Sequence, residues 1–194
     1  EEFNKLKNIK NSCFIVVSKS GNTLETITNI QNIIAKINLK NKLVVITELT
    51  NNNLIDIANK FNAEIIEHKD FIGGRYSVLT AVGLVPLGLA KFDIRGLMQG
   101  ADQVYDGIQC LDGELASSSV SQSIIEYAAS RKVAWDMGKR VEVLAYSNPK
   151  LAAFIEWWKQ LFAESEGKNG LGLLPVGMLY PTDLHSLGQY LQEG

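Results

Sequence analysis

The stretch Phe14-Ile-Val-Val-Ser-Lys-Ser-Gly-Asn-Thr-Leu-Glu-Thr26 joins a short apolar run, a turn rich in hydroxyl groups and the beginning of a helical pattern. Residues 15–17 are β-branched and continuous, as expected for a strand that is buried on both faces. From Leu24 to Ile37, apolar residues recur at helical spacing. The sequence therefore predicts a buried strand, a tight turn and a helix.

The turn carries groups that can bind an anion. Ser18, Ser20 and Thr23 bring hydroxyls, and the unpaired N–H groups and dipole of a helix N-terminus favour negative charge. A phosphate or a phosphosugar is the expected ligand. A simpler interpretation stays open, in which Thr23 or Asn22 caps the helix and Gly21 only tightens the turn. The turn has neither the G-x-x-x-x-G-K-[ST] nor the G-x-G-x-x-G spacing, so a nucleotide is not expected.

Composition narrows the class of protein. With 194 residues, 46% of them hydrophobic, the chain can bury a sizeable core, and its net charge of −2 with both signs scattered argues against a nucleic-acid-binding face. Cys13 and Cys110 show no metal-ligand spacing, so we expect neither a structural zinc nor a disulfide framework. The sequence shows neither a signal peptide nor a membrane-length apolar run, which favours the cytoplasm and no membrane partner. Because the chain opens at Glu1 without Met and soon enters a core strand, we expect a piece of a larger protein.

The order of the patterns predicts an α/β fold. A second buried strand at 43–47, a helix at 53–61 and a strand at 63–67 follow the first helix, which gives the order β-α-β-α-β. This alternation predicts a parallel, doubly wound sheet whose ligand site lies at the carboxyl ends of the strands. Ser18 to Thr23 sits at such an end.

The alternation of predicted strands and helices changes near residue 70, where we place a boundary between two lobes. Gly73 and Gly74 precede Arg75, whose planar guanidinium suits a phosphate or a carboxylate, although a Gly-Gly turn with a surface arginine fits the local sequence somewhat better.

Beyond Arg75 the sequence predicts an apolar helix that reaches residue 91, followed by helices at 94–109 and 119–137. The second of these has cap candidates at 117–119, and we expect its Trp135 to lie in the core. The rest of the chain predicts a strand at 141–146, an aromatic-rich helix at 150–162 and a final helix capped by Thr182 or Asp183, while the segment 170–177 is too glycine-rich to assign to a strand.

Four motifs occur in an order that resembles the bacterial-type glucose-6-phosphate isomerase family. They are Ser18–Thr26, Gly73–Ser77, Gln160–Lys168 and His185 within Thr182–Gln189. The first also resembles the phosphate loop of sugar-isomerase (SIS) domains. The resemblance implies doubly wound, flavodoxin-like SIS sheets flanked by helices in two subdomains. Residues 1–70 would form the later half of the first subdomain, and 71–194 the connecting helices and much of the second. Both would be incomplete, because the family's upstream Gly-Ser segment and C-terminal lysine helix are not found in this sequence.

The resemblance also implies a reaction. The family interconverts glucose 6-phosphate and fructose 6-phosphate through ring opening and a cis-enediol, with no metal and no cofactor. Glu164 would be the base that moves the proton, as the chemistry of one carboxylate over two carbons requires, while Glu166 is expected to be a loop or surface carboxylate. Arg75 would stabilise the enediolate, and Gln160 would line the same site from one helical turn earlier.

The remaining assignments concern the phosphate and the partner subunit. Ser18, Ser20 and Thr23 map onto the phosphate-binding hydroxyls of the family. His185 would assist opening of the sugar ring from the neighbouring subunit, which implies a homodimer. Taken alone, a histidine after Asp183-Leu184 is more often a capping or hydrogen-bonding residue, and the motif around it favours the role in ring opening. The other histidine, His68, is expected to be structural.

Two other functions stay open. A non-catalytic SIS-type sugar-phosphate-binding module would keep the hydroxyls of the turn but would have no use for Glu164 together with Arg75 and His185. An isomerase of another phosphosugar, such as mannose 6-phosphate, would use nearly every group named. Because unpaired sheet edges and uncovered core would be exposed, we expect the 194-residue chain on its own to aggregate or to be inactive.

Overall fold

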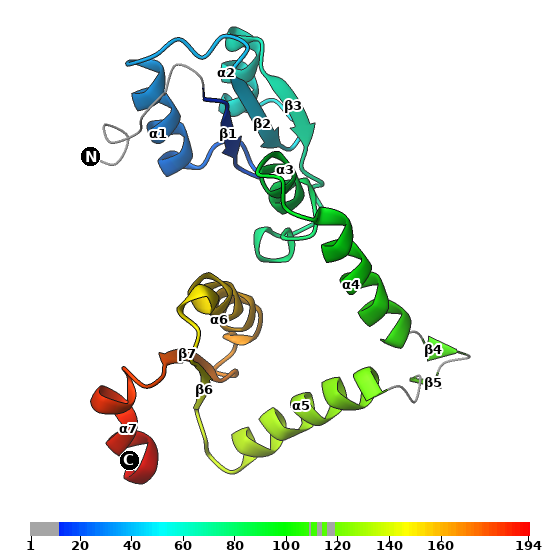
Figure 1. Cartoon of the computed structure of the whole chain (residues 1–194), viewed down its shortest axis with the longest axis vertical. Helices are drawn as coiled ribbons and strands as arrows, with labels where there is room; N and C mark the ends of the chain where they lie inside the picture. The colour runs from blue at the N-terminus through cyan, green and yellow to red at the C-terminus, as the bar shows by residue number, and fades with distance from the viewer. Residues whose placement is uncertain (1–11, 109, 112–113, 116–118) are drawn as a thin grey trace. The chain divides into compact units, whose positions relative to one another are not determined.

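We describe a computed structural model of the chain, which covers residues 12–108, 110–111, 114–115 and 119–194 (Figure 1). The chain divides into two compact units, Glu1–Met98 and Gln99–Gly194. These units are defined by contacts between residues, so the SIS subdomain boundary at residue 70 stays a prediction. Within the described ranges, no helix is both long enough and apolar enough to cross a membrane.

The first unit is built on a three-stranded parallel sheet in the order β1-β2-β3. In register, Phe14 lies opposite Leu43 and Val44 opposite Glu64. The five predicted elements are all present, and they are β1 (Phe14–Val17), α1 (Leu24–Ile34), β2 (Leu43–Thr47), α2 (Asn53–Phe61) and β3 (Glu64–Glu67). The prediction of an α/β fold with parallel sheets flanked by helices is confirmed.

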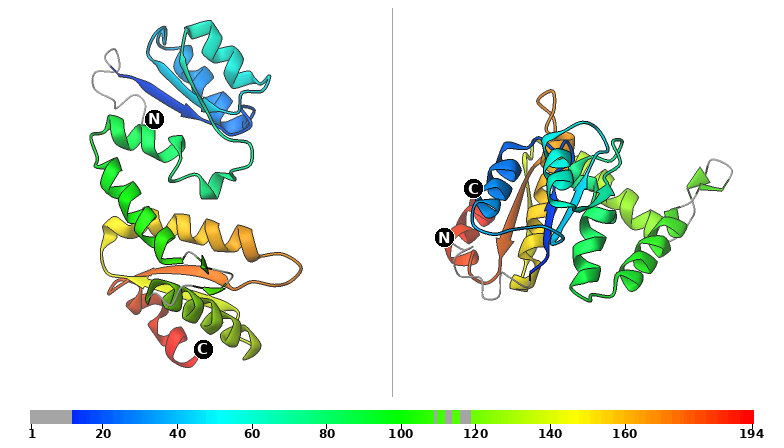
Figure 2. Two further views of the ribbon diagram at one scale, coloured as in Figure 1. Left: turned by 90° about the vertical axis from the view of Figure 1, so that its right-hand side faces the viewer. Right: turned by 90° about the horizontal axis from the view of Figure 1, so that it is seen from above.

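The core of this unit lies between β2 and the two helices. Leu43 and Val45 of β2 pack with Ile30 of α1 and with Leu54 and Ala58 of α2, and all five are at most 3% exposed. Burying each of the larger aliphatic side chains contributes about 1.5–3 kcal/mol. Because the strands are parallel and α1 and α2 each follow a strand through a short connection, the carboxyl ends of β1 and β2 and the N-termini of both helices lie at the same end of the sheet (Figure 2).

The end of the first unit differs from its prediction at one helix start. A short 3-10 helix, η3 (Gly74–Tyr76), precedes α3 (Ala81–Leu89), whose N-terminus is capped by Thr80 through a 3.3 Å hydrogen bond from the Val82 N–H. This cap fixes the helix start later than the apolar pattern alone suggests. The next helix, α4 (Ile94–Ile108), has its predicted extent apart from Gln109, which lies outside the described residues.

The second unit contains the parallel pair β6-β7. The glycine-rich segment 170–177 that could not be assigned from sequence holds the first four residues of β7, a strand that pairs along its whole length with β6. A Cβ on Gly177 would lie 2.2 Å from Cγ2 of Ile155, so glycine allows α6 to pack directly on the strand (Figure 2). The elements of this unit are β4 (Cys110–Leu111), β5 (Glu114–Leu115), α5 (Ser119–Asp136), β6 (Val141–Tyr146), η4 (Pro149–Leu151), α6 (Ala152–Glu166), β7 (Leu174–Leu179) and α7 (Leu184–Glu193).

Two predictions in this unit need correction. The aromatic-rich helix does not end at residue 162, because α6 continues to Glu166. Trp135 is half-buried rather than in the core, and the guanidinium carbon of Arg140 lies 3.8 Å from its ring centroid. The cap candidates Ser117 and Ser118 lie outside the described residues.

Candidate functional site

The predicted phosphate loop directly follows β1. The backbone N–H of Ser18 donates to the carbonyl of Ile46 at 3.1 Å, which extends the ladder to β2 by one residue. The Ser18 hydroxyl lies 2.9 Å from the Thr23 hydroxyl, and Ser18 is only 5% exposed. The N–H of Asn22 donates to Oγ of Ser20 at 3.3 Å. The three predicted phosphate-binding hydroxyls therefore belong to one loop at the carboxyl end of β1.

The N-terminus of α1 is not capped by a side chain. Thr23 occupies the N-cap position, but its side chain makes no capping hydrogen bond and lies against Ser18 instead. The side-chain oxygen of Asn22 accepts from the N–H of Asn53 at 3.1 Å, so Asn22 binds α2 rather than α1. Thr23 therefore holds the N-cap position, as one alternative predicted, but without a side-chain capping bond, and Asn22 is not the cap. A helix N-terminus without a side-chain cap keeps amide donors for an anion.

Gly21 is required by the shape of this loop. Its φ is +66°, and a Cβ there would lie 2.0 Å from Oδ1 of Asn52. That oxygen accepts from the N–H groups of Leu54 at 3.0 Å and Ile55 at 2.9 Å, so Asn52 caps α2 while it packs against the loop. Asn52 was not predicted from the sequence. Its position between a buried strand and a helix is a capping signal that could have identified it.

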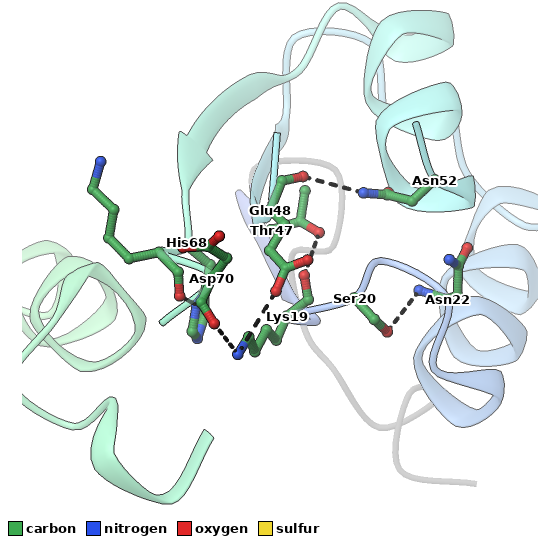
Figure 3. Close-up of polar contacts among 9 residues, drawn as sticks. Lys19, Ser20, Asn22, Thr47, Glu48, Asn52, His68 and Asp70 are labelled. Carbon is green, nitrogen blue, oxygen red and sulfur yellow. Dashed lines mark hydrogen bonds and ion pairs between the residues drawn. The ribbon is translucent and has the colours of Figure 1, made fainter. Parts of the chain in front are cut away.

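Lys19 ties the loop to two other segments (Figure 3). Its ammonium donates to the backbone carbonyl of Asp70 at 2.5 Å and lies 3.7 Å from the carboxylate of Glu48. Its own carbonyl accepts from the Thr47 hydroxyl at 3.2 Å. His68 is 5% exposed, and its Nδ1 lies 3.0 Å from the carbonyl of Lys69, which agrees with the structural role expected for it. Lys19 thus fixes the chain that leads from β3 towards Arg75.

Arg75 lies in the 3-10 turn η3 and is half-buried. The carbon of its guanidinium is 4.8 Å from the centroid of the Tyr76 ring. The segment is therefore a 3-10 turn with a partly exposed arginine, which leaves both the ligand-binding and the surface-arginine interpretations open. The role of Arg75 towards an enediolate stays a prediction.

Gln160 and Glu164 lie together on the last turns of α6. The amide Nε2 of Gln160 donates to Oε2 of Glu164 at 3.2 Å, which follows from their i, i+4 spacing on a helix that persists to residue 166. Both residues are exposed. The structure brings these two predicted residues together, and it leaves the carboxylate of Glu164 accessible from one side of the helix.

Glu166 agrees with its prediction only in part, because its side chain is 39% exposed but it does not lie in a loop. It is the last residue of α6, and its Oε1 accepts from Nη1 of Arg131 at 2.8 Å. The same guanidinium donates from Nε to Oε2 of Glu142 at 2.8 Å. Burial lowers the pKa of Arg131, but the hydrogen bonds to Glu166 and Glu142 outweigh burial and hold this pKa above its usual value. Glu166 is therefore a structural carboxylate at a helix end and not a loop residue.

His185 lies in the first turn of α7 and is exposed. Its backbone N–H donates to the carbonyl of Thr182 at 3.2 Å. Asp183 occupies the N-cap position, but its carboxylate accepts from the N–H of Leu179 at 2.6 Å and makes no capping bond to α7. His185 is thus an exposed residue in the first turn of α7, and its role in ring opening stays a prediction.

A cavity of about 520 Å³ lies beside the end of α6, within the second unit. Its lining includes Arg131, Glu166 and Trp135 but neither Gln160 nor Glu164, so it is separate from the predicted catalytic face. In the ranges that the structure describes, no group of three or more His, Cys, Asp or Glu side chains is placed to hold a metal ion.

Comparisons with known proteins agree on one family. A family model described as "Phosphoglucose isomerase" matches residues 1–171. Curated relatives include glucose-6-phosphate isomerases from Leptospira biflexa, 38% identical over 92% of this chain, and from Staphylococcus saprophyticus, 40% identical over 92%. The chain spans only about 40% of the length of these two relatives.

Two solved structures share the fold. A hypothetical protein from Thermus thermophilus matches all of this chain with a TM-score of 0.82 and 25% identity, and the match covers 47% of that protein. A glucose-6-phosphate isomerase from Chlamydia trachomatis matches 98% of this chain with a TM-score of 0.76 and 22% identity, over 38% of its own length. Both likenesses support the α/β architecture described above.

Proposed function

Because this chain belongs to the phosphoglucose isomerase family, we propose that the protein interconverts glucose 6-phosphate and fructose 6-phosphate. The observation that carries the proposal is the family match over residues 1–171, since it includes the phosphate loop, Arg75 and Glu164 in one chain. As the chain spans about 40% of its relatives' length, the activity is proposed for the protein in its full length.

The loop after β1 would hold the phosphate group. Ser18 and Thr23 are 2.9 Å apart, and Ser20 lies in the same turn, so their hydroxyls can donate to phosphate oxygens at the uncapped start of α1. Lys19 is occupied by Asp70 and Glu48, so it shapes the loop rather than binding the ligand. In this role the loop binds substrate and transition state equally, which affects affinity more than turnover.

Glu164 would carry out the proton transfer. After the sugar ring opens, its carboxylate takes the proton from C2 of the aldose, the hydroxyl proton passes from O2 to O1 at the cis-enediol stage, and the protonated Glu164 returns its proton to C1, which leaves the ketose. Gln160 donates to Glu164 and can hold its orientation. Arg75 would stabilise the negative charge that develops on the enediolate oxygen.

His185 would assist ring opening by moving a proton at the ring oxygen. Its exposure at the start of α7 is what a residue donated to a second subunit requires, and we propose that it acts in trans within a homodimer. A cytoplasmic location and the two SIS subdomains, residues 1–70 and 71–194, belong to the same proposal, which rests on the family and on the order of the motifs.

Solvent deuterium exchange at C2 of the sugar phosphate tests the proposal in the full-length protein. Wild type should exchange and isomerise, and Glu164→Gln should lose about 10²–10⁴-fold in both rates because the base is removed. The matched control is Glu156→Gln, on the same helix, where the carboxylate is 70% exposed and only pairs with Lys159. This control should leave both rates unchanged.

Other outcomes would point to other functions. Binding of sugar phosphate by wild type without any exchange would support the non-catalytic binding module. Exchange that survives in Glu164→Gln would show that another group is the base. Faster turnover of mannose 6-phosphate than of glucose 6-phosphate would support the isomerase of a different phosphosugar.

A further inference from the structure

The proposed base sits close to a helix end. Glu164 is two residues before Glu166, where α6 ends. The last four carbonyl groups of a helix lack partners within the helix, so a final turn frays unless something else holds it. A displacement of about 1 Å at a reacting group can cost on the order of 100-fold in rate. Whatever fixes the end of α6 therefore controls the position of Glu164.

Arg131 of α5 holds this helix end. Its Nη1 donates to Glu166 at 2.8 Å, and its Nε donates to Glu142 of β6 at 2.8 Å. The other carboxylate oxygen of Glu142 accepts from the Tyr127 hydroxyl at 2.5 Å. We call Arg131, Glu142 and Glu166 the charged clamp. It joins α5, β6 and the last turn of α6.

The charged clamp is partly buried from solvent, which strengthens its ion pairs. The side chains of Arg131 and Glu142 are 12% and 16% exposed, and that of Glu166 is 39% exposed. The guanidinium carbon also lies 4.4 Å from the centroid of the Phe162 ring. Partly buried charge-assisted hydrogen bonds with a cation–π contact hold an orientation better than exposed pairs do.

The clamp acts on the side of α6 that faces away from the proposed chemistry. Phe162 and Glu166 are four residues apart and share the helix face that contacts Arg131. Gln160 and Glu164, offset by two residues from this pair, lie on the opposite face. Arg131 can therefore fix the rotation and the axial position of the last turn without contacting a substrate bound by Glu164.

We propose that Arg131 is a positioning residue for Glu164 and acts through Glu166 by holding the final turn of α6. The inference rests on the proposed function, because it assigns Arg131 to the proton-transfer step. It predicts a specific kinetic result, in which loss of the clamp lowers turnover but leaves substrate affinity nearly intact, since the phosphate loop is untouched.

The test uses Arg131→Lys and Arg131→Met in the full-length protein, with Lys132→Met as the matched control. Lys132 neighbours Arg131 on α5, and among the residues that the structure describes its ammonium pairs with Asp136 at i, i+4 on the exposed side of the helix. We expect the two Arg131 variants to lose about 10- to 100-fold in kcat, with KM within about threefold of wild type. We expect no change in Lys132→Met.

A second variant separates positioning from loss of folding. Glu166→Gln removes the charge of one clamp partner and keeps an acceptor, so it should lower kcat less than Arg131→Met does, and the double variant should be no worse than Arg131→Met. Amide hydrogen exchange of residues 163–167 should become faster in Arg131→Met and stay unchanged in Lys132→Met.

The outcomes keep the inference and the proposed function apart. If wild type isomerises and the Arg131 variants keep kcat per folded molecule, or lose it only in proportion to the unfolded fraction, the positioning role is wrong. Equal effects on KM and kcat would also overturn it. If wild type does not isomerise, the proposed function fails. Amide hydrogen exchange at residues 163–167 that is unchanged in Arg131→Met would independently show that the charged clamp does not hold the end of α6.

Discussion

The phosphate loop and the end of α6 carry the two halves of the proposed chemistry, and they are held in different ways. The loop is fixed mainly by neutral hydrogen bonds and close packing, such as Ser18 to Thr23 and Gly21 against Asn52, and Lys19 adds one longer ion pair to Glu48 at 3.7 Å. The end of α6 is fixed by the charged clamp, in which Arg131 bonds to Glu142 and Glu166. The first kind of support is set by shape, and the second by charge.

The difference has a functional reason. A loop that only binds phosphate needs its amides and hydroxyls in one fixed arrangement, and a glycine at φ +66° with a neighbouring cap provides this. A carboxylate that moves protons must stay accessible while its helix end is held still. Support from the opposite helix face meets both needs, because Arg131 does not compete with the substrate for Glu164.

The largest effect on the loop is expected from Gly21→Ala. The added Cβ would lie 2.0 Å from Oδ1 of Asn52, and the alanine would have to adopt the φ of +66° that glycine has here. Backbone strain and loss of the α2 cap would both follow. We expect a loss of roughly 3 kcal/mol in local stability, measured by hydrogen exchange of the β1 and β2 amides. Gly138→Ala is the control, because the φ of Gly138 is also positive, at +84°, but a Cβ added there would have no heavy atom within 4 Å apart from those of its chain neighbours. An equal loss at both glycines would show that packing against Asn52 does not shape the loop.

Asn52→Ala should have the next largest effect. Its buried amide caps α2 through Leu54 and Ile55 and also donates to the carbonyls of Glu48 and Thr50, each at 3.1 Å. Truncation should lower the free energy of unfolding of this unit by about 2 kcal/mol. The control is Asn148→Ala, which removes one exposed capping bond. Hydrogen exchange of α2 compares the two, and a loss below that of the control would contradict the role of Asn52 in supporting the loop.

The sequence predicted the loop side of this comparison better than the helix side. The strand, turn and helix around Ser18 to Thr23 depend on neighbouring residues, and helical spacing and turn chemistry report such short-range order. The family motif likewise places Gln160 and Glu164 on one helix, and their hydrogen bond confirms that they share a face. Their roles in catalysis stay predictions.

Arg131 could not be predicted because its partners are distant in the sequence. It bonds to Glu166, 35 residues away, and no local pattern shows that α5 and the end of α6 meet. Similarly, β7 was not recognised, since glycine is normally unfavourable in a strand and its reason at Gly177 is the close approach of Ile155. Tertiary packing, rather than local preference, decided both.

Ser18→Ala tests by steady-state kinetics whether the phosphate loop and the charged clamp act on different steps. The variant loses the hydroxyl that lies beside Thr23 in the loop, which should raise KM for the sugar phosphate about tenfold and change kcat by less than about twofold. Ser123→Ala on α5 is the control, because its exposed hydroxyl bonds only to the carbonyl of Ser119. Steady-state kinetics of the full-length protein measure both parameters. A fall in kcat like that expected for Arg131→Lys would mean that loop and clamp do not act on separate steps.

Tyr127→Phe should have the smallest effect, and it tests the clamp by pH. Burial raises the pKa of the Tyr127 phenol, and the hydrogen bond to Glu142 raises it further. A raised pKa means that the folded state favours the protonated phenol, so this stabilisation is fully present below the unfolded pKa of about 10 and is lost as pH rises through the higher folded value. Wild type should therefore exceed Tyr127→Phe in urea-unfolding stability at pH 7–9, and the difference should shrink above pH 10. Tyr105→Phe, at a position 65% exposed, should show no such convergence with wild type. A difference between wild type and Tyr127→Phe that is constant with pH would show that the phenol contributes by packing alone and that Glu142 is held by Arg131 without it.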